Sequence, residues 1–363
     1  MPERKTIFFH KPQINISCPS TGRMWIIAGC AFFCVLQSSF RDGGKSLGIA
    51  ITALLTALIL EFILTRKTAA NNSGNSFSKV MDGSAAATAM ILSIMFPNQL
   101  HPVYAALGTV FAIIVVKYSF GGLGSNWLNP ALGGWLFVRF SWPDAYKNAL
   151  ENSSASITEM LASSDINPID NSITELLNNY IFSIAGAQMP SGYINLLFND
   201  SAGIITDRGL LALLLGTIII TAIGINRSWI PLVFLTVYGF LIRFAGDADL
   251  FWNGDILYGI FSGGTIAAAF ILAAEPSSSA KLNIGIIFSV ILSAVLAWFF
   301  RYKCMEYSGC FIALALVNCF TPIIRHIEEK IFLSEKKLKK NSEEFYQDKN
   351  KSYLESGAVQ EKP

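Results

Sequence analysis

The stretch SLGIAITALLTALILEFILT, Ser46 to Thr65, decides the fold class. A helix needs roughly 20 apolar residues to cross the ~30 Å hydrocarbon core of a membrane. The rest of the chain has the same character, because 52% of its residues are hydrophobic, 14% are charged and its mean hydropathy is +0.47. Soluble domains have a different composition. The sequence therefore predicts an all-α integral membrane protein.

Ten apolar segments are candidate transmembrane helices. They occupy residues 24–40, 46–65, 81–96, 102–120, 130–141, 209–225, 228–244, 255–274, 281–299 and 307–325. Five of them precede a long polar insertion and five follow it. This order predicts two five-helix halves, residues 24–141 and 209–325.

Three polar regions flank and separate these halves: residues 1–23, 142–208 and 326–363. The last region, with EKKLKKNSEEFYQDKNK, has the composition of a charged, solvated tail. The insertion 142–208 is acidic and has only Lys147 and Arg208 as basic residues. Its acidic residues are Asp144, Glu151, Glu159, Asp165, Asp170, Glu175, Asp200 and Asp207.

The distribution of Lys and Arg predicts the orientation, because cytoplasmic loops are enriched in basic residues. With the N-terminus inside, the cytoplasmic side gains Arg4, Lys5, Lys11, Arg23, Arg66, Lys67, Lys79, Lys117, Arg227, Lys281 and the tail. The short outer loops keep only Arg41, Lys45, Arg243, Arg301 and Lys303. Both termini are therefore expected in the cytoplasm, with the insertion outside. No cleavable signal is apparent, and the net charge of +2 gives no indication of a nucleic-acid partner.

The two halves resemble each other at their third segments. With an offset of 180 residues, Gly83, Ala87, Ala89, Ile91 and Leu92 match Gly263, Ala267, Ala269, Ile271 and Leu272. An odd number of helices in each copy would turn the second copy upside down, as in inverted-repeat transporters. Chance similarity between helices rich in small residues is the alternative. The high Gly and Ala content predicts that both segments lie centrally.

Signatures of metal sites and of soluble enzymes are absent from the sequence. The six cysteines form no CxxC pair, the three histidines are dispersed, and the chain has no Walker loop, nucleophile elbow or HExxH motif. Cys30 and Cys34 share a helix face, which favours packing of small apolar side chains. An autonomous hydrolase or kinase is not expected.

The stretch KYSFGGLGSNWLNPALGG, Lys117 to Gly134, is the first candidate site. Glycines allow irregular backbone and close approach of a ligand, and a proline suits the first turn of the next helix. A helix N-terminus beside such a loop suits an anion or the electron-rich edge of a flavin. The candidate binding residues are Lys117, Gly121, Gly122, Gly124, Asn126 and Asn129, with Pro130 starting the helix. The alternatives are a tight turn with an Asn cap and, for Lys117, a lysine that snorkels to the interface.

Asp82 and Glu275 form the second candidate site. They lie at opposite ends of the two matched segments DGSAAATAMILSIMFPN and SGGTIAAAFILAAEPSSS. An inverted repeat would bring both to the cytoplasmic side. Ionisable groups at such depth are candidates for an ion or cofactor path, and interfacial water around both carboxylates is the alternative.

These segments resemble the family that contains the D subunit of Rnf-type ion-translocating oxidoreductases and the B subunit of sodium-pumping NADH:quinone reductases. The matching pieces are FGGLGSNWLNPA, the two segments just quoted, IPLVFLTVYGFL from Ile230 and SGCFIALALVNCFTPII from Ser308. The resemblance covers about residues 23–324. It implies a multi-pass subunit of the bacterial inner membrane that passes electrons through flavin within a multi-subunit complex, while the complex moves Na⁺ or H⁺.

The resemblance also implies an FMN joined through its phosphate to a threonine in a D-x-x-S-G-A-T motif of the insertion, attached by a partner enzyme. The sequence departs from this motif, since no S-G-A-T occurs there. The best shortened match is IDNSITEL, with Asp170, Ser172 and Thr174 in place of the family residues. NSSASITEML, with Ser156 or Thr158, is the second match, and loss of the flavin is a further alternative. A non-covalent FMN or riboflavin is expected among Gly121 to Pro130.

Two other functions compete with this interpretation. A stand-alone secondary transporter would use the same inverted repeat to bind a solute at the middle of the membrane, without flavin. A scaffold subunit without a redox centre would associate with its partners and carry no chromophore.

Overall fold

The computed structural model describes residues 20–69, 82–119, 126, 128–153, 172, 175–176, 179–180, 203–245, 256–276 and 278–331. Within these ranges the secondary structure is helical, apart from one isolated antiparallel bridge between Pro97 and Ile204. The prediction of a helical protein is therefore confirmed for the part of the chain that the structure describes.

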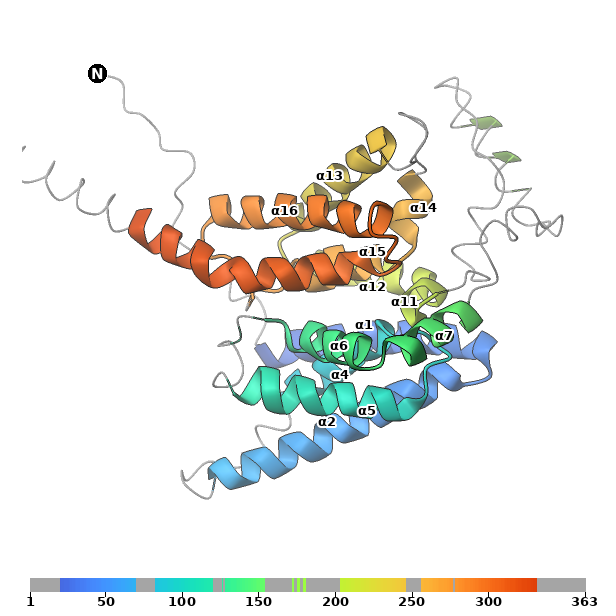
Figure 1. Cartoon of the computed structure of the whole chain (residues 1–363), viewed down its shortest axis with the longest axis vertical. Coiled ribbons are helices and arrows are strands. Elements are labelled where there is room, and N and C mark those ends of the chain that lie inside the picture. The colour runs from blue at the N-terminus through green and yellow to red at the C-terminus, as the bar shows by residue number, and fades with distance from the viewer. Residues whose placement is uncertain are drawn as a thin grey trace, which may run out of the picture.

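The helices form two groups, seen in Figure 1 as a blue-to-green group and a yellow-to-red group. The first contains α1 (Ser20–Asp42), α2 (Lys45–Ala69), α4 (Ser84–Ile94), α5 (Pro102–Val110), the π-helix η1 (Phe111–Tyr118), α6 (Pro130–Ser141) and α7 (Pro143–Ser153). The second contains α11 (Ile205–Arg208), α12 (Leu210–Ala222), α13 (Trp229–Ala245), α14 (Ile256–Phe261), α15 (Thr265–Ala267), the π-helix η3 (Ala268–Leu272), α16 (Asn283–Tyr302) and a last helix, Gly309–Ile331.

Four of the described helices are long and apolar enough to cross a membrane: Thr21–Phe40, Lys45–Arg66, Asn283–Tyr302 and Gly309–Ile331. Four shorter apolar helices are Ser84–Ile94, Pro102–Tyr118, Leu210–Ala222 and Trp229–Ala245. These helices support a multi-pass membrane protein. Helical residues occur in each of the ten predicted segments, but the crossing of the membrane by all ten stays a prediction.

Helix α4 lies at the centre of the first group, where it contacts α1, α2, α5 and α6. All of its residues except Thr88 are buried. Five of its eleven residues are Ser or Ala between Ser84 and Ala89, so neighbouring backbones can approach closely. In the second group, every described residue from Thr265 to Leu272 except Phe270 is buried. The central location predicted for both third segments is confirmed.

Helices α1 and α12 join the two groups through small side chains. The Cys30 Sγ lies 3.6 Å from the Gly216 carbonyl oxygen, and a Cβ added to Gly216 would meet Cys30 at 2.9 Å. A Cβ added to Gly209, at the start of α12, would likewise collide with Cys34. Cys34 is fully buried. The two cysteines therefore pack in a helix crossing, as their shared helix face predicts.

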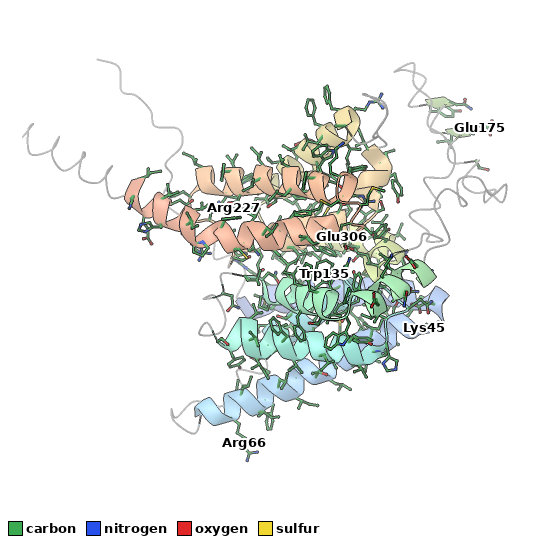
Figure 2. All side chains as sticks on the ribbon, viewed as in Figure 1. Lys45, Arg66, Trp135, Glu175, Arg227 and Glu306 are labelled. Carbon is green, nitrogen blue, oxygen red and sulfur yellow. The ribbon has the colours of Figure 1, made fainter. Side chains whose placement is uncertain are left out.

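The charged ends of the molecule are shown in Figure 2. Arg66 at the end of α2 and Arg227 before α13 lie at one end, whereas Lys45 at the start of α2 and Glu175 lie at the other. We refer below to the end that holds Arg66 and Arg227 as the inner end and to the opposite end as the outer end. These names follow the predicted orientation, which stays a prediction.

Candidate functional site

A buried ion pair between Lys117 and Glu61 lies at the inner end of the first group. The Lys117 Nζ is 3.0 Å from each Glu61 carboxylate oxygen and 2.7 Å from the Ser84 Oγ. Lys117 and Glu61 are each 3% exposed. The three side chains come from η1, α2 and α4, so the contact ties η1 and α2 to the central helix of this group.

The sequence around Ser84 explains why α4 begins at this point. Gly83 has a left-handed conformation (φ 77°), which costs little only for a residue without a Cβ. The Asp82 Oδ1 accepts a hydrogen bond from the Ser84 backbone N–H at 2.8 Å. A cation beside the positive end of a helix is unfavourable by itself. The carboxylates of Glu61 and Asp82 compensate for it, because a buried charge needs a partner of opposite sign.

Lys117 therefore does not snorkel to the interface, and that alternative is wrong. A buried ammonium that lacked Glu61 would be strongly destabilised, since moving an ion out of water costs several kcal/mol. Its Nζ also lies 5.8 Å from the centre of the Tyr118 ring. The lysine is thus held by protein groups within the helix bundle.

Asn126 and Asn129 anchor the two ends of the glycine-containing loop. In the orientation that satisfies its surroundings, the Asn126 amide donates to the carbonyls of Val116 and Lys117, each at 3.2 Å. These carbonyls lie in the last turn of η1, where helical partners are missing. Asn126 thus stabilises the end of η1.

Asn129 caps the start of α6, and Pro130 is the first residue of that helix. The Asn129 Oδ1 accepts from the backbone N–H groups of Ala131 at 2.8 Å and Leu132 at 3.3 Å. The predicted start of the helix at Pro130 and the Asn cap are both confirmed. The cap leaves the Asn129 Nδ2 free to donate elsewhere.

That amide nitrogen donates to the carboxylate of Glu275, which follows η3 in the second group. The structure thus joins a residue of the first candidate site to a residue of the second. It also joins Lys117 and Asp82 through Ser84. Residues of the two predicted sites therefore meet in two places. Lys117 meets Asp82 through Ser84 at the start of α4, and Asn129 meets Glu275 at the start of α6.

Several predicted residues lie outside the described part of the chain. Gly121, Gly122 and Gly124 are among them, as are Asp170 and Thr174. Ser172 is described and is an exposed helical residue. The covalent flavin site therefore stays a prediction.

The second group contains a buried polar cluster at the outer end that sequence reasoning missed. The Asp207 carboxylate accepts hydrogen bonds from the Gly263 and Gly264 N–H groups, both at 3.0 Å, and from the Tyr307 hydroxyl at 2.7 Å. Burial raises the pKa of the Asp207 carboxyl, and the hydrogen bond from Tyr307 opposes this shift. From the sequence, Asp207 is only one acidic residue of the insertion among several.

Arg301, near the end of α16, completes this outer cluster. Its guanidinium donates to the Ser262 carbonyl at 3.0 Å and to the Ser262 Oγ at 2.7 Å, and it lies 5.3 Å from the Tyr307 ring. Arg301 is 8% exposed, although the sequence predicts an outer-loop residue. The sequence does contain a signal that Glu61 and Arg301 are buried charges, because Glu61 interrupts a long apolar run and Arg301 ends one.

The arrangement can hold charge inside a membrane protein. No group of three or more His, Cys, Asp or Glu residues with metal-binding geometry occurs among the described residues. Lys117, Asn126 and Asn129 already have protein partners. They therefore fit the role of fixing the end of η1 and the start of α6.

Comparison with known proteins shows the relationship of the chain to one family. A model of the NQR2, RnfD, RnfE family matches residues 8–333. The chain is 24% identical, over 88% of its length and 94% of the relative, to the D subunit of the proton-translocating ferredoxin:NAD(+) oxidoreductase complex of Clostridium ljungdahlii. It is 27% identical to the D subunit of the Na(+)-translocating counterpart of Acetobacterium woodii, over 72% of the chain and 76% of that protein. It is 29% identical to the D subunit of the ion-translocating oxidoreductase complex of Alcanivorax borkumensis, over 79% of the chain and 84% of that protein.

Proposed function

Because the chain belongs to the NQR2, RnfD, RnfE family, we propose that it is the membrane-embedded D subunit of an Rnf-type complex that couples electron transfer to the movement of Na⁺ or H⁺. The observation that carries this proposal is the match to three proteins named as D subunits, each over 72% or more of this chain. The chain would work only with other subunits of the complex, as the names of these relatives indicate.

The buried charges support a role in ion movement. Glu61 and Lys117 lie within helices that are otherwise apolar, and such residues are costly unless they have a function or a partner. Asp82 and Glu275 are proposed as contributors near this ion or cofactor path. Asp82 bonds Ser84 at the start of α4, which Lys117 also contacts, and Glu275 bonds Asn129 at the start of α6.

An inverted repeat of two five-helix halves is proposed as the architecture. A similar contact in each half supports it, although the residues are not paired at the offset of 180: Lys117 Nζ to Ser84 Oγ in one half and Arg301 NH2 to Ser262 Oγ in the other, both at 2.7 Å. The matched glycines Gly83 (φ 77°) and Gly263 (φ 67°) are both left-handed and lie just before the central helix of each half. The two contacts lie at the inner and the outer end, as an inverted repeat requires.

Flavin is proposed as the redox group. A covalent FMN would be joined through its phosphate to Thr174, next to Asp170 and Ser172, after attachment by a partner enzyme. A non-covalent FMN or riboflavin would lie among Gly121 to Pro130, whose flanks are fixed by Asn126 and Asn129. When bound, flavin supplies the electron-carrying chemistry that side chains lack.

The proposed location is the bacterial inner membrane, with both termini in the cytoplasm and the insertion 142–208 outside. Arg66 and Arg227 lie at the same end of the molecule and Glu175 of the acidic insertion lies at the opposite end, which supports this orientation. Basic residues favour the cytoplasmic side of a membrane.

The test is in-gel flavin fluorescence of the denatured subunit, co-expressed with its flavin-attaching enzyme, followed by mass spectrometry of peptides from residues 142–208. The expected result is a fluorescent band with an FMN adduct on Thr174. Thr174→Ala should remove the adduct, whereas the matched control Thr158→Ala should keep it.

A dark band without any adduct would exclude the covalent flavin. Absorbance of the native complex would then separate a bound flavin from a scaffold subunit. Solute-coupled flux by the isolated subunit in vesicles, without partner subunits, would contradict the proposed function as a whole.

A further inference from the structure

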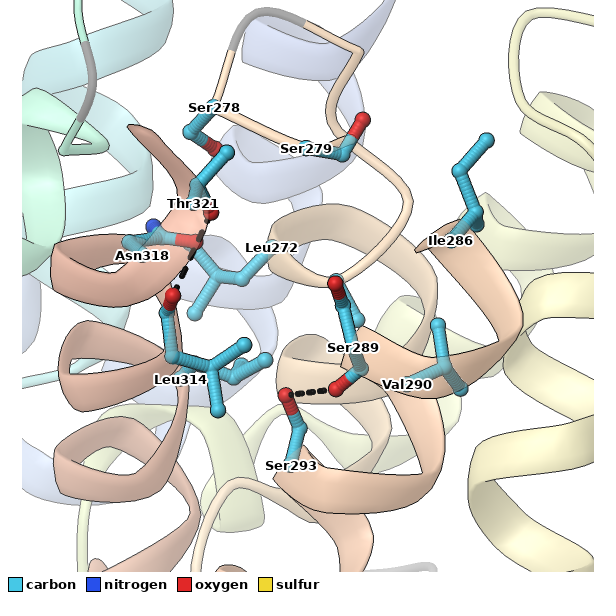
Figure 3. A pocket seen from close by; sticks show the side chains of 12 residues that line it. Leu272, Ser278, Ser279, Ile286, Ser289, Val290, Ser293, Leu314, Asn318 and Thr321 are labelled. Atoms are coloured by element: carbon cyan, nitrogen blue, oxygen red, sulfur yellow. Dashed lines mark hydrogen bonds between the residues drawn. The ribbon is translucent and has the colours of Figure 1, made fainter. Parts of the chain in front are cut away.

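A small cavity lies in the second group between α16, the last helix and the segment that follows η3. Its polar lining consists of short hydroxyl and amide side chains, and Figure 3 shows these groups around one shared space. They are Ser278, Ser279, Ser289, Ser293, Asn318 and Thr321. Four of them come from the apolar helices α16 and Gly309–Ile331, in which an empty polar cavity would be unfavourable.

The hydroxyl groups of this cavity present acceptors. Ser289 donates to the Gly285 carbonyl at 2.7 Å, Ser293 to the Ser289 carbonyl at 2.8 Å, and Thr321 to the Val317 carbonyl at 3.2 Å. Each hydroxyl proton is thus committed to the carbonyl one turn earlier in its own helix. The lone pairs of the oxygen atoms remain available to an occupant.

Asn318 supplies a donor. Its side chain is on the last helix, the residue is 8% exposed, and its Nδ2 has no hydrogen-bond partner among the described residues. A buried amide without a partner costs about 1–3 kcal/mol. An occupant that both accepts from this amide and donates to hydroxyl oxygens would remove that cost.

We propose that this cavity binds a water molecule. The cavity volume is about 20 Å³, and a water molecule needs roughly 10–15 Å³ by the same measure together with two to four polar partners. Water can accept from the Asn318 amide and donate to two hydroxyl oxygens. A bare cation fits less well, because the amide hydrogens would repel it and the described lining residues include no carboxylate.

The position of the cavity indicates what the water does. Ser293 lies about ten residues into α16, or about 15 Å from the inner end of that helix. This is about half of the ~30 Å hydrocarbon core. Beyond Ser293 the buried residues of α16 are Ala294 and Ala297 until Arg301 is reached. The hydroxyls and the bound water therefore place a series of polar groups between the inner end and the middle of the membrane.

Such a series would act as a path for protons from the cytoplasmic side to the midpoint when the hydroxyls rotate from their carbonyls toward the water. This role rests on the proposed function, whereas the binding of water does not. The mouth of the path is fixed by Arg325, which donates to the Ser279 carbonyl at 2.7 Å and 3.1 Å, and by Glu328, which accepts from the backbone N–H groups of Lys281 and Leu282 at 3.0 Å.

X-ray hydroxyl-radical footprinting of the subunit within its purified complex tests the water site. Radicals formed from bound water oxidise adjacent side chains even where bulk solvent has no access. The expected result is oxidation of Leu314 and Leu272, which line the cavity and are each 3% exposed. Leu92 and Leu213, both fully buried and outside the cavity lining, are the matched controls. Equal labelling of all four leucines would overturn the proposal.

The variant Asn318→Leu removes the donor and fills the cavity. Labelling of Leu314 should fall to the level of Leu92 in this variant. The control Asn98→Leu changes another buried asparagine outside the cavity and should leave the labelling of Leu314 unchanged. Ser293→Val serves as a second filling variant if Asn318→Leu fails to assemble, and retained labelling in an assembled filling variant would contradict the water site.

Proton movement is then measured in vesicles that contain the complex. Asn318→Leu should lower the number of protons moved per electron while electron transfer continues. If Asn318→Leu loses the labelling of Leu314 but moves the same number of protons per electron, the proton path is overturned and the water site still stands. Absence of electron transfer in the unchanged complex would instead contradict the proposed function.

Discussion

Arg139 and Glu306 form a two-point ion pair that joins the two groups of helices. The Arg139 Nε lies 3.0 Å from the Glu306 Oε1 and its NH2 lies 2.9 Å from Oε2. The guanidinium also lies 5.2 Å from the centre of the Tyr146 ring. The contact joins the last turn of α6 to the segment between α16 and the last helix. Together with the bond from Asn129 to Glu275, it ties the two groups on opposite sides of Trp135, which lies near the middle of the molecule in Figure 2.

Arg139→Lys should weaken this tie, because a lysine cannot make two parallel hydrogen bonds to one carboxylate. The two side chains are about one fifth exposed, so solvent screens part of the attraction. We expect a coupling free energy of about 1 kcal/mol between Arg139→Ala and Glu306→Ala in a double-mutant cycle. The free energies come from SDS titration in mixed micelles, and additive single effects would contradict a working ion pair.

Lys117→Met should be strongly destabilising, because it leaves the buried Glu61 carboxylate without its cation. Breaking a buried pair from one side costs about 3–5 kcal/mol. The double variant Lys117→Met/Glu61→Gln removes both charges and should recover a large part of that loss. Thermal unfolding in detergent provides the comparison, and a double variant less stable than Lys117→Met would show that the pair is not coupled.

Asn129→Asp should keep the helix cap but place a second carboxylate against Glu275. Like charges at contact distance repel in a poorly solvated site. The variant should therefore be less stable than Asn129→Ser, which also caps the helix. Adding Glu275→Gln to Asn129→Asp should restore the stability, as judged by the yield of the folded subunit and its thermal midpoint. Without such a rescue, the Asn129–Glu275 contact would be unimportant.

Gly263→Ala should be far more damaging than Gly224→Ala. Both glycines have positive φ, 67° and 72°, so each alanine carries a similar backbone cost of about 1–2 kcal/mol. A Cβ at Gly224 would meet no atom within 4 Å, whereas one at Gly263 would collide with the Arg301 guanidinium and the Tyr307 carbonyl. The comparison isolates the packing of the outer cluster, and equal thermal midpoints would show that the cluster can move aside.

Lys45→Cys and Arg227→Cys should be labelled from opposite sides of the membrane. Both positions are exposed and lie at the outer and the inner end. In spheroplasts that express a subunit without its natural cysteines, an impermeant maleimide should modify residue 45 directly. It should modify residue 227 only after permeabilisation. The reverse pattern would invert the proposed orientation.

Much of the fold could be predicted from the apolar pattern. The run from Ser46 to Thr65 lies inside α2, and the small residues after Gly83 form the buried helix α4. Local signals also predict the cap at Asn129 and the helix start at Pro130. These features depend on neighbours in sequence, which is why a pattern is sufficient.

The partners of the candidate residues could not be predicted in the same way. Lys117 and Glu61 are 56 residues apart and meet only because η1 packs against α2, with Ser84 of α4 beside them. The sequence places Arg301 with the outer loops because it ends an apolar run, but the residue is covered by Tyr258 and Tyr307. Pairings of this kind depend on tertiary packing, and neither spacing nor composition specifies them.

The π-helix η1 sets the direction in which Lys117 points. Along α5 and η1 every fourth residue is buried: Ala105, Thr109, Ile113 and Lys117. In a regular α-helix, three steps of four residues would turn the side chain about 120° away from its starting direction. The wider turns of η1 keep the series on one face. Removing one residue between Phe111 and Val116 would turn the wide turns into a regular α-helix and leave the ammonium on the same face. An added residue would instead turn it by about 100°. The segment therefore carries one residue more than the direction of Lys117 needs, and that spare residue could be lost without moving the buried charge.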